Sequence, residues 1–394
     1  MLILNGKKVI LFNLSNFMIP YSKQSISKED TKAVLKVLQS NFLTQGPLVG
    51  KFENKVNKFC GSKYSVAVNS GSSALHIACL ALGVKRGDLV WTVPNTFVAS
   101  ANCAINCGAK IDFVDIDKDT FNISIAALKK KLLLAKKRKK LPKVLIPVHL
   151  GGQPTEQKKI WELSKKYKFK ILEDASHSIG AKHLGVKVGN NKWADITVFS
   201  FHPVKIITTG EGGVATTNSN IYYNKMKIFR DNGIKRLPNN WRYEHISAGF
   251  NYRMTDIAAS LGISQLKKIN KFLIKRNDIA KKYKKLLNNL PIKTQKILPG
   301  NYSSYHLFII QFDLKNSKLT YDQIFKLFRK NKYYVNLHYA PLHLSPYFRK
   351  IGFKKGHFPV SEKYGASSIS IPIYYDLPPK ELKKFVKIIK KLID

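Results

Sequence analysis

Lys205 is the residue of this chain whose setting most clearly favours covalent chemistry. It lies in the segment SFHPVKIITTGEGG, residues 200–213, which contains no other lysine although the chain as a whole is rich in lysine. Its neighbours are apolar, and a glycine-rich turn follows. A lysine amine attacks a carbonyl carbon only in its neutral form, which partial desolvation favours. We therefore predict that Lys205 forms a Schiff base with an aldehyde cofactor; a solvated surface lysine is the alternative.

Asp174 is the candidate partner of such a cofactor. It ends an apolar run in the segment ILEDASHSIGA, residues 171–181. A carboxylate that is hydrogen-bonded to a pyridine nitrogen keeps that nitrogen protonated, and the ring then withdraws electrons. A helix N-cap is the alternative role for this aspartate. His177 in the same segment is expected either to support the cofactor or Asp174, or to be a structural histidine.

Two further segments have features that suit a flat, phosphorylated cofactor. In residues 69–83 a Gly/Ser turn precedes a helix-length segment, so N–H groups near Gly71 and Ser72 would face a phosphate, although serine is also an ordinary N-cap. In residues 92–105 Phe97 follows a β-rich run and could stack on a ring; a place in the core is its alternative. Together the four segments predict an aldehyde-cofactor site.

The elements that must position these four segments alternate from about residue 60 onward. Short β-rich runs are separated by helix-length segments, a pattern typical of a mainly parallel α/β sheet with helices on both faces. In such sheets the loops after the strands carry the chemistry, and each of the four segments ends or follows one of the runs. The predicted strands are residues 64–69, 88–93, 110–116, 143–148, 169–174 and 195–201.

A second group of elements follows this sheet. A helical pattern covers residues 255–290 and is closed by Pro291. Beyond it, the pattern predicts a strand over residues 305–314, a helix over 319–331 and an amphipathic helix over 380–393. We therefore expect a large and a small α/β domain. The expected division is an N-terminal extension at 1–17, a large cofactor-binding domain with an N-terminal arm at 18–265, and a linking helix with the small domain at 266–394.

The chain carries a large positive charge, with 68 Lys and Arg residues against 24 Asp and Glu residues and a formal net charge of +44. The basic residues are mostly lysines spread along the whole chain, whereas proteins that read nucleic acids cluster their charge and use arginine. We therefore expect an anionic small-molecule substrate and no nucleic acid. A basic nucleic-acid-binding protein without catalysis is the remote alternative.

Cysteine use and hydropathy indicate a cytoplasmic protein. Four cysteines are too few for a disulfide scaffold in 394 residues. Cys103 and Cys107 are four apart on a predicted helix and suit small buried apolar residues better than metal ligands. No apolar run approaches the roughly 20 residues of a membrane span. Residues 1–17 lack a cleavage site for secretion, and we expect that translation begins at Met18.

From about Met18 to its carboxyl end, the chain resembles the sugar-nucleotide aminotransferases of the DegT/DnrJ/EryC1/StrS group. The resemblance is carried by the Lys205 segment, by LTQGPLVGKFE at 43–53 and by GFNYRMTDIAASLGISQL at 249–266. It implies the aspartate-aminotransferase fold, fold type I, and the cofactor pyridoxal 5′-phosphate (PLP). A dinucleotide-dependent oxidoreductase is disfavoured, because no G-x-G-x-x-G turn joins an early strand to a helix.

The resemblance also implies roles for individual residues. Lys205 would carry the cofactor, Asp174 would contact its pyridinium nitrogen and Phe97 would stack on its ring. Relatives with histidine in place of the lysine are dehydratases, so the lysine favours transamination, with glutamate as the expected donor. Asn251 resembles an asparagine that reaches the cofactor phosphate of the neighbouring subunit, which implies an obligate homodimer with composite sites. The implied phosphate contacts within the chain are Gly71, Ser72 and Ser200.

Within the group, the segments at 146–154, 249–256 and 336–349 most resemble the enzymes of the pseudaminic acid pathway. Those enzymes aminate C4 of a UDP-linked N-acetylated 6-deoxy keto-sugar, which makes that sugar the expected substrate. A dTDP- or GDP-linked sugar, aminated at C3 or C4, is the alternative. Among the implied substrate contacts, the two tyrosines could instead serve interdomain packing, and the histidine could instead be a structural one. These contacts are Tyr21, Asn41, Phe42, Leu43, Thr44, His338 and Tyr339.

Overall fold

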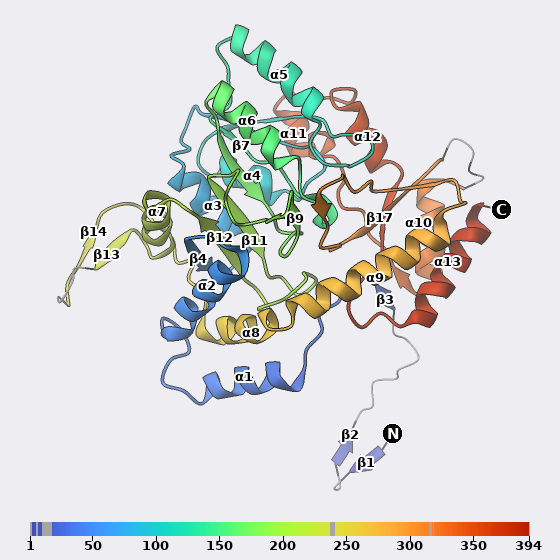
Figure 1. Ribbon diagram of the computed structural model, residues 1–394, viewed down its shortest axis with the longest axis horizontal. Helices are drawn as coiled ribbons and strands as arrows, with labels where there is room; N and C mark the ends of the chain where they lie inside the picture. The colour runs from blue at the N-terminus through green and yellow to red at the C-terminus, as the bar shows by residue number, and fades with distance from the viewer. Residues whose placement is uncertain are drawn as a thin grey trace.

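The computed structural model of this chain describes residues 2–4, 7–9, 18–236, 241–314, 317 and 319–393. Figure 1 shows a large body built around one sheet and a smaller body that contains the carboxyl terminus. The expected extension at 1–17 lies mostly outside the described residues; its described parts are strands β1 (Leu2–Leu4) and β2 (Lys7–Val9). Translation from Met18 remains a prediction.

The central sheet has seven strands in the order β4-β12-β11-β8-β7-β5-β6. Neighbouring strands from β11 to β6 are parallel, whereas β12 is antiparallel to both β11 and β4. The mainly parallel sheet predicted from the sequence is therefore confirmed, and β12 is an addition to it. The strands are β4 (Tyr64–Val68), β5 (Leu89–Thr92), β6 (Lys110–Phe113), β7 (Val144–Leu145), β8 (Lys170–Asp174), β11 (Ile196–Ser200) and β12 (Gly213–Thr217).

Helices cover both faces of this sheet, as predicted. Along β11, Ile196 and Val198 pack in the core under one face, while Phe199 packs under the other, as the two-residue period of a strand requires. One face is covered by α3 (Gly71–Ala81), α4 (Ala99–Ile105) and α7 (Asn220–Arg230). The other is covered by α2 (Pro47–Cys60), α5 (Ile125–Lys137), α6 (Gln157–Tyr167) and α8 (Asp256–Leu266).

The helix expected over residues 255–290 is two helices, α8 (Asp256–Leu266) and α9 (Ile269–Leu287). The break coincides with a tertiary contact that no local pattern reveals. Asp30, on helix α1 (Lys28–Leu38), is fully buried and accepts hydrogen bonds from Gln265 and Lys268 at the junction. These two side chains turn toward the buried carboxylate, and the helix stops there. Helix α9 then crosses from the large body to the small one (Figure 1).

The small body contains an antiparallel sheet of β15 (Ile292–Thr294), β17 (Phe308–Phe312) and β19 (Ser368–Ile371). The predicted strand and two helices of this region correspond to β17, α10 (Tyr321–Lys330) and α13 (Pro379–Ile393). The end of α9 packs in this core through Ile279 and Tyr283, while its start packs in the large body through Ile269 and Phe272. The domain boundaries at 17/18 and 265/266 remain predictions.

Shorter elements complete the described chain. Strand β3 (Ile19–Pro20), at the start of the N-terminal arm, pairs in parallel with β18 (Tyr333–Tyr334) of the small body. Among the described helices, none is long and apolar enough to cross a membrane. The remaining elements are β9 (Lys182–His183), β10 (Val186–Lys187), β13 (Ile234–Arg236), β14 (Tyr243–His245), β16 (Asn301–Tyr302), α11 (Pro346–Lys350), α12 (Pro359–Gly365) and the short 3₁₀ helices η2 (Leu150–Gly152) and η3 (Leu342–Leu344).

Candidate active site

A cavity of about 810 Å³ lies at the carboxyl ends of strands β4, β5, β8 and β11, where parallel α/β sheets hold their ligands. The loops after these strands line it together with the N-terminal arm and residues 336–339 of the small body. The structure thus brings most of the sequence-predicted residues into one space. Those that line it are Tyr21, Gly71, Ser72, Phe97, Asp174, His177, Ser200, Lys205, His338 and Tyr339.

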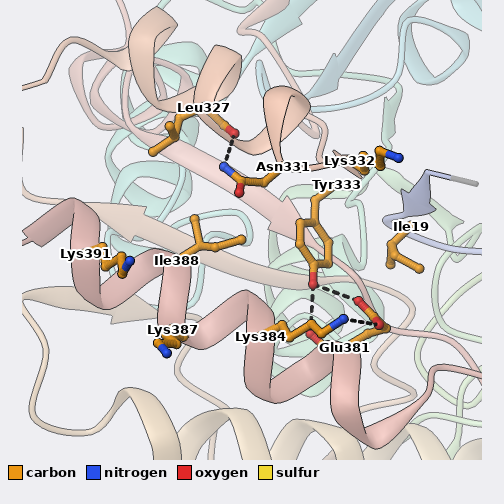
Figure 2. Close-up of a pocket in the computed structure, with 10 residues that line it drawn as sticks. All are labelled: Ile19, Leu327, Asn331, Lys332, Tyr333, Glu381, Lys384, Lys387, Ile388 and Lys391. Atoms are coloured by element: carbon orange, nitrogen blue, oxygen red, sulfur yellow. Dashed lines mark hydrogen bonds and ion pairs between the residues drawn. The ribbon is translucent and has the colours of Figure 1, made fainter. Parts of the chain in front are cut away.

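A second cavity, of about 890 Å³, lies in the small body between α10, α13 and Ile19 (Figure 2). Its carboxylate, Glu381, is already engaged by the hydroxyl of Tyr333 at 2.9 Å and the amine of Lys384 at 3.3 Å. The lysines that line it do not set this cavity apart, because lysines occur over the whole chain. Although this cavity is the larger of the two, it is lined by none of the residues predicted for chemistry.

Lys205 follows β11 on a loop, and its backbone N–H donates to the carbonyl of His202 at 2.9 Å. Burial lowers the pKa of its amine to about 8, and the negative charge of Asp174 acts in the opposite direction. An amine with this pKa is neutral in roughly a quarter of molecules at about pH 7.5, far more than an exposed lysine. Lys205 is also half-buried and lines the cavity, unlike a solvated surface lysine, and an amine with this pKa is suited to attack a carbonyl.

Asp174 ends β8 with only 5% of its surface exposed. Its Oδ2 accepts a hydrogen bond from Ser100 Oγ at 2.6 Å, and its Oδ1 accepts one from the backbone N–H of Ser176 at 3.1 Å. The hydroxyl of Thr96 lies 2.7 Å from that of Ser100 and holds it in place. No helix begins after Asp174 in the described chain, where the next element is β9, so the N-cap alternative does not hold.

Ser100 and Ser176 are site residues that sequence reasoning missed. Ser100 lies in the first turn of α4, which follows β5, and β5 is separated from β8 in the sheet by β7. The contact of Ser100 with Asp174 depends on the strand order, and no motif in the sequence signals it. Ser176, by contrast, lies two residues after Asp174, where a carboxylate commonly accepts the N–H group two residues on.

The start of α3 forms a cradle for an anion. The N-cap Ser70 accepts the N–H group of Ser73 at 3.1 Å, while Ser72 is exposed toward the cavity. A Cβ atom on Gly71 would lie 2.9 Å from the Cβ atom of Ser200, so the close approach of α3 to the end of β11 requires glycine here. The N–H groups of a first helical turn and two serine hydroxyls are donors that fit a phosphate.

Three buried histidines lie beside the amine of Lys205. Burial, followed by the positive charge of that lysine, lowers the pKa of His338 to about 3 and holds the pKa of His177 well below its usual range. The ring of His306, which sequence reasoning missed, lies 4.4 Å from that of His177, and burial lowers its pKa as well. These imidazoles are therefore neutral near pH 7.

Aromatic residues complete the wall of the cavity. Phe97 is 54% exposed and lines the cavity, so the core alternative for it is wrong. Its ring centroid lies 5.9 Å from that of Tyr339, whose hydroxyl lies 3.2 Å from Nε2 of His177. The buried Nδ1 atom of that histidine has no partner among the described residues, which leaves a polar atom for a ligand at this site.

The N-terminal arm is tied to the lysine loop by a buried network. Tyr21 lines the cavity, and the next residue, Ser22, donates its hydroxyl to the carbonyl of Val204 at 2.8 Å. Arg276 of α9 is fully buried and donates to Ser22 Oγ at 3.3 Å and to the carbonyl of Ile373 at 2.8 Å. This arginine, which sequence reasoning also missed, therefore links the arm, the linking helix and the small body.

Five of the predicted residues do not line the cavity of their own chain. Asn251 is exposed and forms a β-bridge with Asp231, and Thr44 forms one with Thr255 at the end of an exposed loop. A residue must be exposed on its own subunit to contribute to the site of a second subunit. Ordinary surface residues are exposed as well, so exposure alone does not distinguish the two roles. The loop residues are Asn41, Phe42, Leu43 and Thr44.

The fold is that of the aspartate-aminotransferase-like transferases, fold type I, and the amine of Lys205 and the carboxylate of Asp174 line one cavity at the strand ends. The chain belongs to the DegT/DnrJ/EryC1/StrS aminotransferase family, which it matches over residues 24–390. The resemblance found in the sequence is therefore confirmed.

Three relatives illustrate the match. The chain is 36% identical to the UDP-4-amino-4,6-dideoxy-N-acetyl-β-L-altrosamine transaminase of Campylobacter jejuni, over 94% of this chain and 96% of that protein. The structure of Helicobacter pylori PseC, an aminotransferase involved in pseudoaminic acid biosynthesis, superposes with a TM-score of 0.88 at 29% identity, over 95% of this chain and 99% of that one. The PLP form of the sugar aminotransferase Spr1654 from Streptococcus pneumoniae gives 0.86 at 26% identity, over 96% and 100%.

Proposed function

We propose that this protein is a cytoplasmic, homodimeric PLP-dependent aminotransferase that acts on a nucleotide sugar. It transfers the amino group of glutamate to the C4 keto group of a UDP-linked N-acetylated 6-deoxy keto-sugar and so forms UDP-4-amino-4,6-dideoxy-N-acetyl-β-L-altrosamine for pseudaminic acid biosynthesis. The observation that carries the proposal is the partly desolvated amine of Lys205 beside the buried carboxylate of Asp174 in one cavity. The altrosamine transaminase of Campylobacter jejuni supports the choice of sugar.

The residues of the cavity fit the proposed cofactor group by group. Bound PLP supplies an aldehyde and an electron-withdrawing ring that stabilises negative charge at the carbon bearing the amine. Asp174, fixed by Ser100, would keep the pyridine nitrogen protonated. The first turn of α3 and Ser200 would bind the phosphate, and the exposed face of Phe97 would stack on the ring.

Lys205 has two roles in this proposal. Its neutral amine would hold the aldehyde of bound PLP until a donor amine takes its place. The freed amine would then act as the general base, accepting the proton from the donor Cα and delivering it to the cofactor. A pKa of about 8 suits both roles near neutral pH, because it leaves an appreciable minority of the amine in the neutral form.

Neutral polar groups on the small-body side of the cavity would bind the sugar. His338 and Tyr339 face the cavity together with Tyr21, and burial raises the pKa of both tyrosines. Uncharged imidazoles and hydroxyls can exchange hydrogen bonds with the hydroxyl and N-acetyl groups of a sugar. The surplus of lysine would attract a nucleoside diphosphate toward the cavity.

The sugar is tested by supplying the purified enzyme with PLP, glutamate and one 4-keto sugar nucleotide at a time, and by identifying products by mass and NMR. We expect the UDP-linked N-acetylated sugar to be aminated at C4 with the highest kcat/KM. Preference for a dTDP- or GDP-linked sugar would contradict the proposed substrate but not the proposed aminotransferase activity. Glutamine and aspartate in place of glutamate test the donor in the same assay.

The reactivity of Lys205 toward the cofactor is expected to rise with pH up to about 8. Only the neutral amine attacks the aldehyde, so the rate of PLP uptake by the cofactor-free enzyme should increase about tenfold per pH unit below this pKa and level off above it. The rate is measured by stopped-flow absorbance from about pH 6 to pH 10. A rate that keeps rising over this whole range would show that the amine is not desolvated.

Asn251 is proposed to bind the cofactor phosphate of the other subunit. Asn251→Ala should then weaken PLP retention, and mixing this variant with Lys205→Ala should restore activity. In a mixed dimer one site carries both substitutions and the other carries neither, so an equimolar mixture should regain about a quarter of wild-type turnover. Subunits are exchanged in mild denaturant and assayed at limiting PLP. Absence of recovery, with mixed dimers verified by mass, would place Asn251 in its own site or in none.

A further inference from the structure

Three cysteines form a cluster where helices α3 and α4 lead away from the cavity. Cys79 on α3 and Cys103 on α4 are buried in the same core, and Cys107, just beyond the end of α4, packs against them. The thiol of Cys107 donates to the carbonyl of Cys103 at 3.2 Å. Unlike the other two, Cys107 is partly exposed, and its neighbours Asn106 and Gly108 lie at the surface.

The surroundings of Cys107 favour its thiolate. Hydrogen bonds with the thiol of Cys79 and with His76, together with the positive charge that His76 can carry, lower the pKa of Cys107 to about 6 against the effect of burial. Nδ1 of His76 lies 3.2 Å from the hydroxyl of Tyr252. A thiolate at the surface is the nucleophile that reacts with peroxides, and a second thiol in contact with it can resolve the product.

We propose that Cys107 is an oxidation site of this protein and that Cys79 closes a disulfide with it. The sulfur of Cys107 attacks one oxygen of hydrogen peroxide, the O–O bond breaks, and hydroxide leaves behind a sulfenic acid. The thiol of Cys79 then attacks that sulfur, the S–O bond breaks, and water leaves with the proton of Cys79. The two cysteines together lose two electrons to one peroxide molecule.

A metal site is the other use of such a cluster. Over the described part of the chain, no group of His, Cys, Asp and Glu side chains has the arrangement to hold a metal ion. A partly exposed thiol packed in one cluster with a buried thiol is also the arrangement that disulfide formation requires, and in the structure both cysteines are free. The cluster therefore points to redox chemistry.

Both helices joined by this disulfide lead to the cofactor cavity. Helix α3 begins at Gly71, and the seven-residue helix α4 carries Ser100, whose hydroxyl holds Asp174 at 2.6 Å. A disulfide between Cys79 and Cys107 would tie α3 to the end of the short helix α4 and impose its own geometry on the pair. We expect this tie to disturb the position of Ser100, and oxidation is therefore expected to weaken cofactor binding. This effect on activity rests on the proposed function, whereas the disulfide does not.

The disulfide is tested on the wild-type holoenzyme by adding a few equivalents of hydrogen peroxide, blocking free thiols and mapping peptides by mass. We expect a Cys79–Cys107 linkage that dithiothreitol reverses, and none in Cys107→Ser. Cys60→Ser is the matched control, because Cys60 is buried and burial raises the pKa of its thiol to about 12. Oxidation of Cys60 before Cys107, or a free Cys79 after full oxidation of Cys107, would overturn the proposal.

A second measurement needs no variant. Iodoacetamide should modify one thiol of the native protein at a rate that levels off above about pH 7, because thiolate is then the dominant form, whereas the rate for free cysteine keeps rising to about pH 8.5. Cys107 is then identified as the labelled residue by mass. A rate that rises in parallel with that of free cysteine contradicts the proposal. Both measurements are independent of activity, so a failed aminotransferase assay leaves them intact.

Discussion

Replacement of Lys205 by Ala is expected to lower turnover by about 10³-fold or more. Under the proposed function the substitution would remove both the amine that holds the cofactor and the base that moves the Cα proton, and a positioned proton-transfer group alone contributes about 10² to 10⁴-fold. Turnover is measured with glutamate and the keto-sugar at saturating PLP. The cofactor should still bind through the α3 cradle and Asp174, but it should no longer be linked to the protein after borohydride reduction.

Two comparisons make this result specific. Lys205→Arg keeps a positive charge but offers no neutral amine, so it should be as inactive as the alanine variant. Lys225→Ala changes an exposed lysine of α7, outside the cavity, and should leave turnover unaltered. If Lys205→Ala keeps a tenth or more of wild-type turnover, this lysine is not the base.

Replacement of Asp174 by Ala is expected to weaken PLP binding by about 2–5 kcal/mol, which is about 30-fold to several thousand-fold in Kd. The variant would leave a pyridinium nitrogen without its buried counter-charge and Ser100 without its acceptor. The Kd is measured by titrating the cofactor-free enzyme, and kcat is measured at saturating cofactor.

Asp174→Asn separates charge from shape. The amide can still accept the hydrogen bond from Ser100, so binding should suffer less than in Asp174→Ala, whereas turnover should fall because the ring nitrogen is no longer held protonated. Asp195→Asn is the matched control, since this carboxylate pairs with Lys170 just before β11, away from the cavity. Normal kcat in Asp174→Asn would contradict a role on the pyridinium nitrogen.

The sheet and the main site residues were accessible from the sequence for a physical reason. Strands buried on both faces are short apolar runs, and parallel strands place the residues that follow them at one edge. Asp174, Lys205 and the Gly71 turn each end or follow such a run, so their meeting could be predicted without coordinates. Strand β12 was not predicted, because Gly213–Thr217 directly follows the glycine-rich turn and contains two small residues and two threonines instead of an apolar run.

Contacts between distant segments escaped prediction because they depend on the assembled fold. Ser100 meets Asp174 only through the strand order, and His306 meets His177 only through the docking of the small body. From the sequence, Arg276 is expected to be an exposed residue of a lysine-rich helix. In the structure it is buried and donates hydrogen bonds to backbone carbonyls. Periodicity describes one element at a time and carries no information on such pairs.

Addition of glutamate alone to the wild-type holoenzyme shows whether this cavity performs the first half of a transamination. We predict a visible absorbance band of lysine-bound cofactor that glutamate removes, with one 2-oxoglutarate released per site and the band restored by the keto-sugar. A protein that shows no such band after incubation with PLP, and releases no 2-oxoglutarate, would contradict the assignment of this cavity as an aminotransferase site.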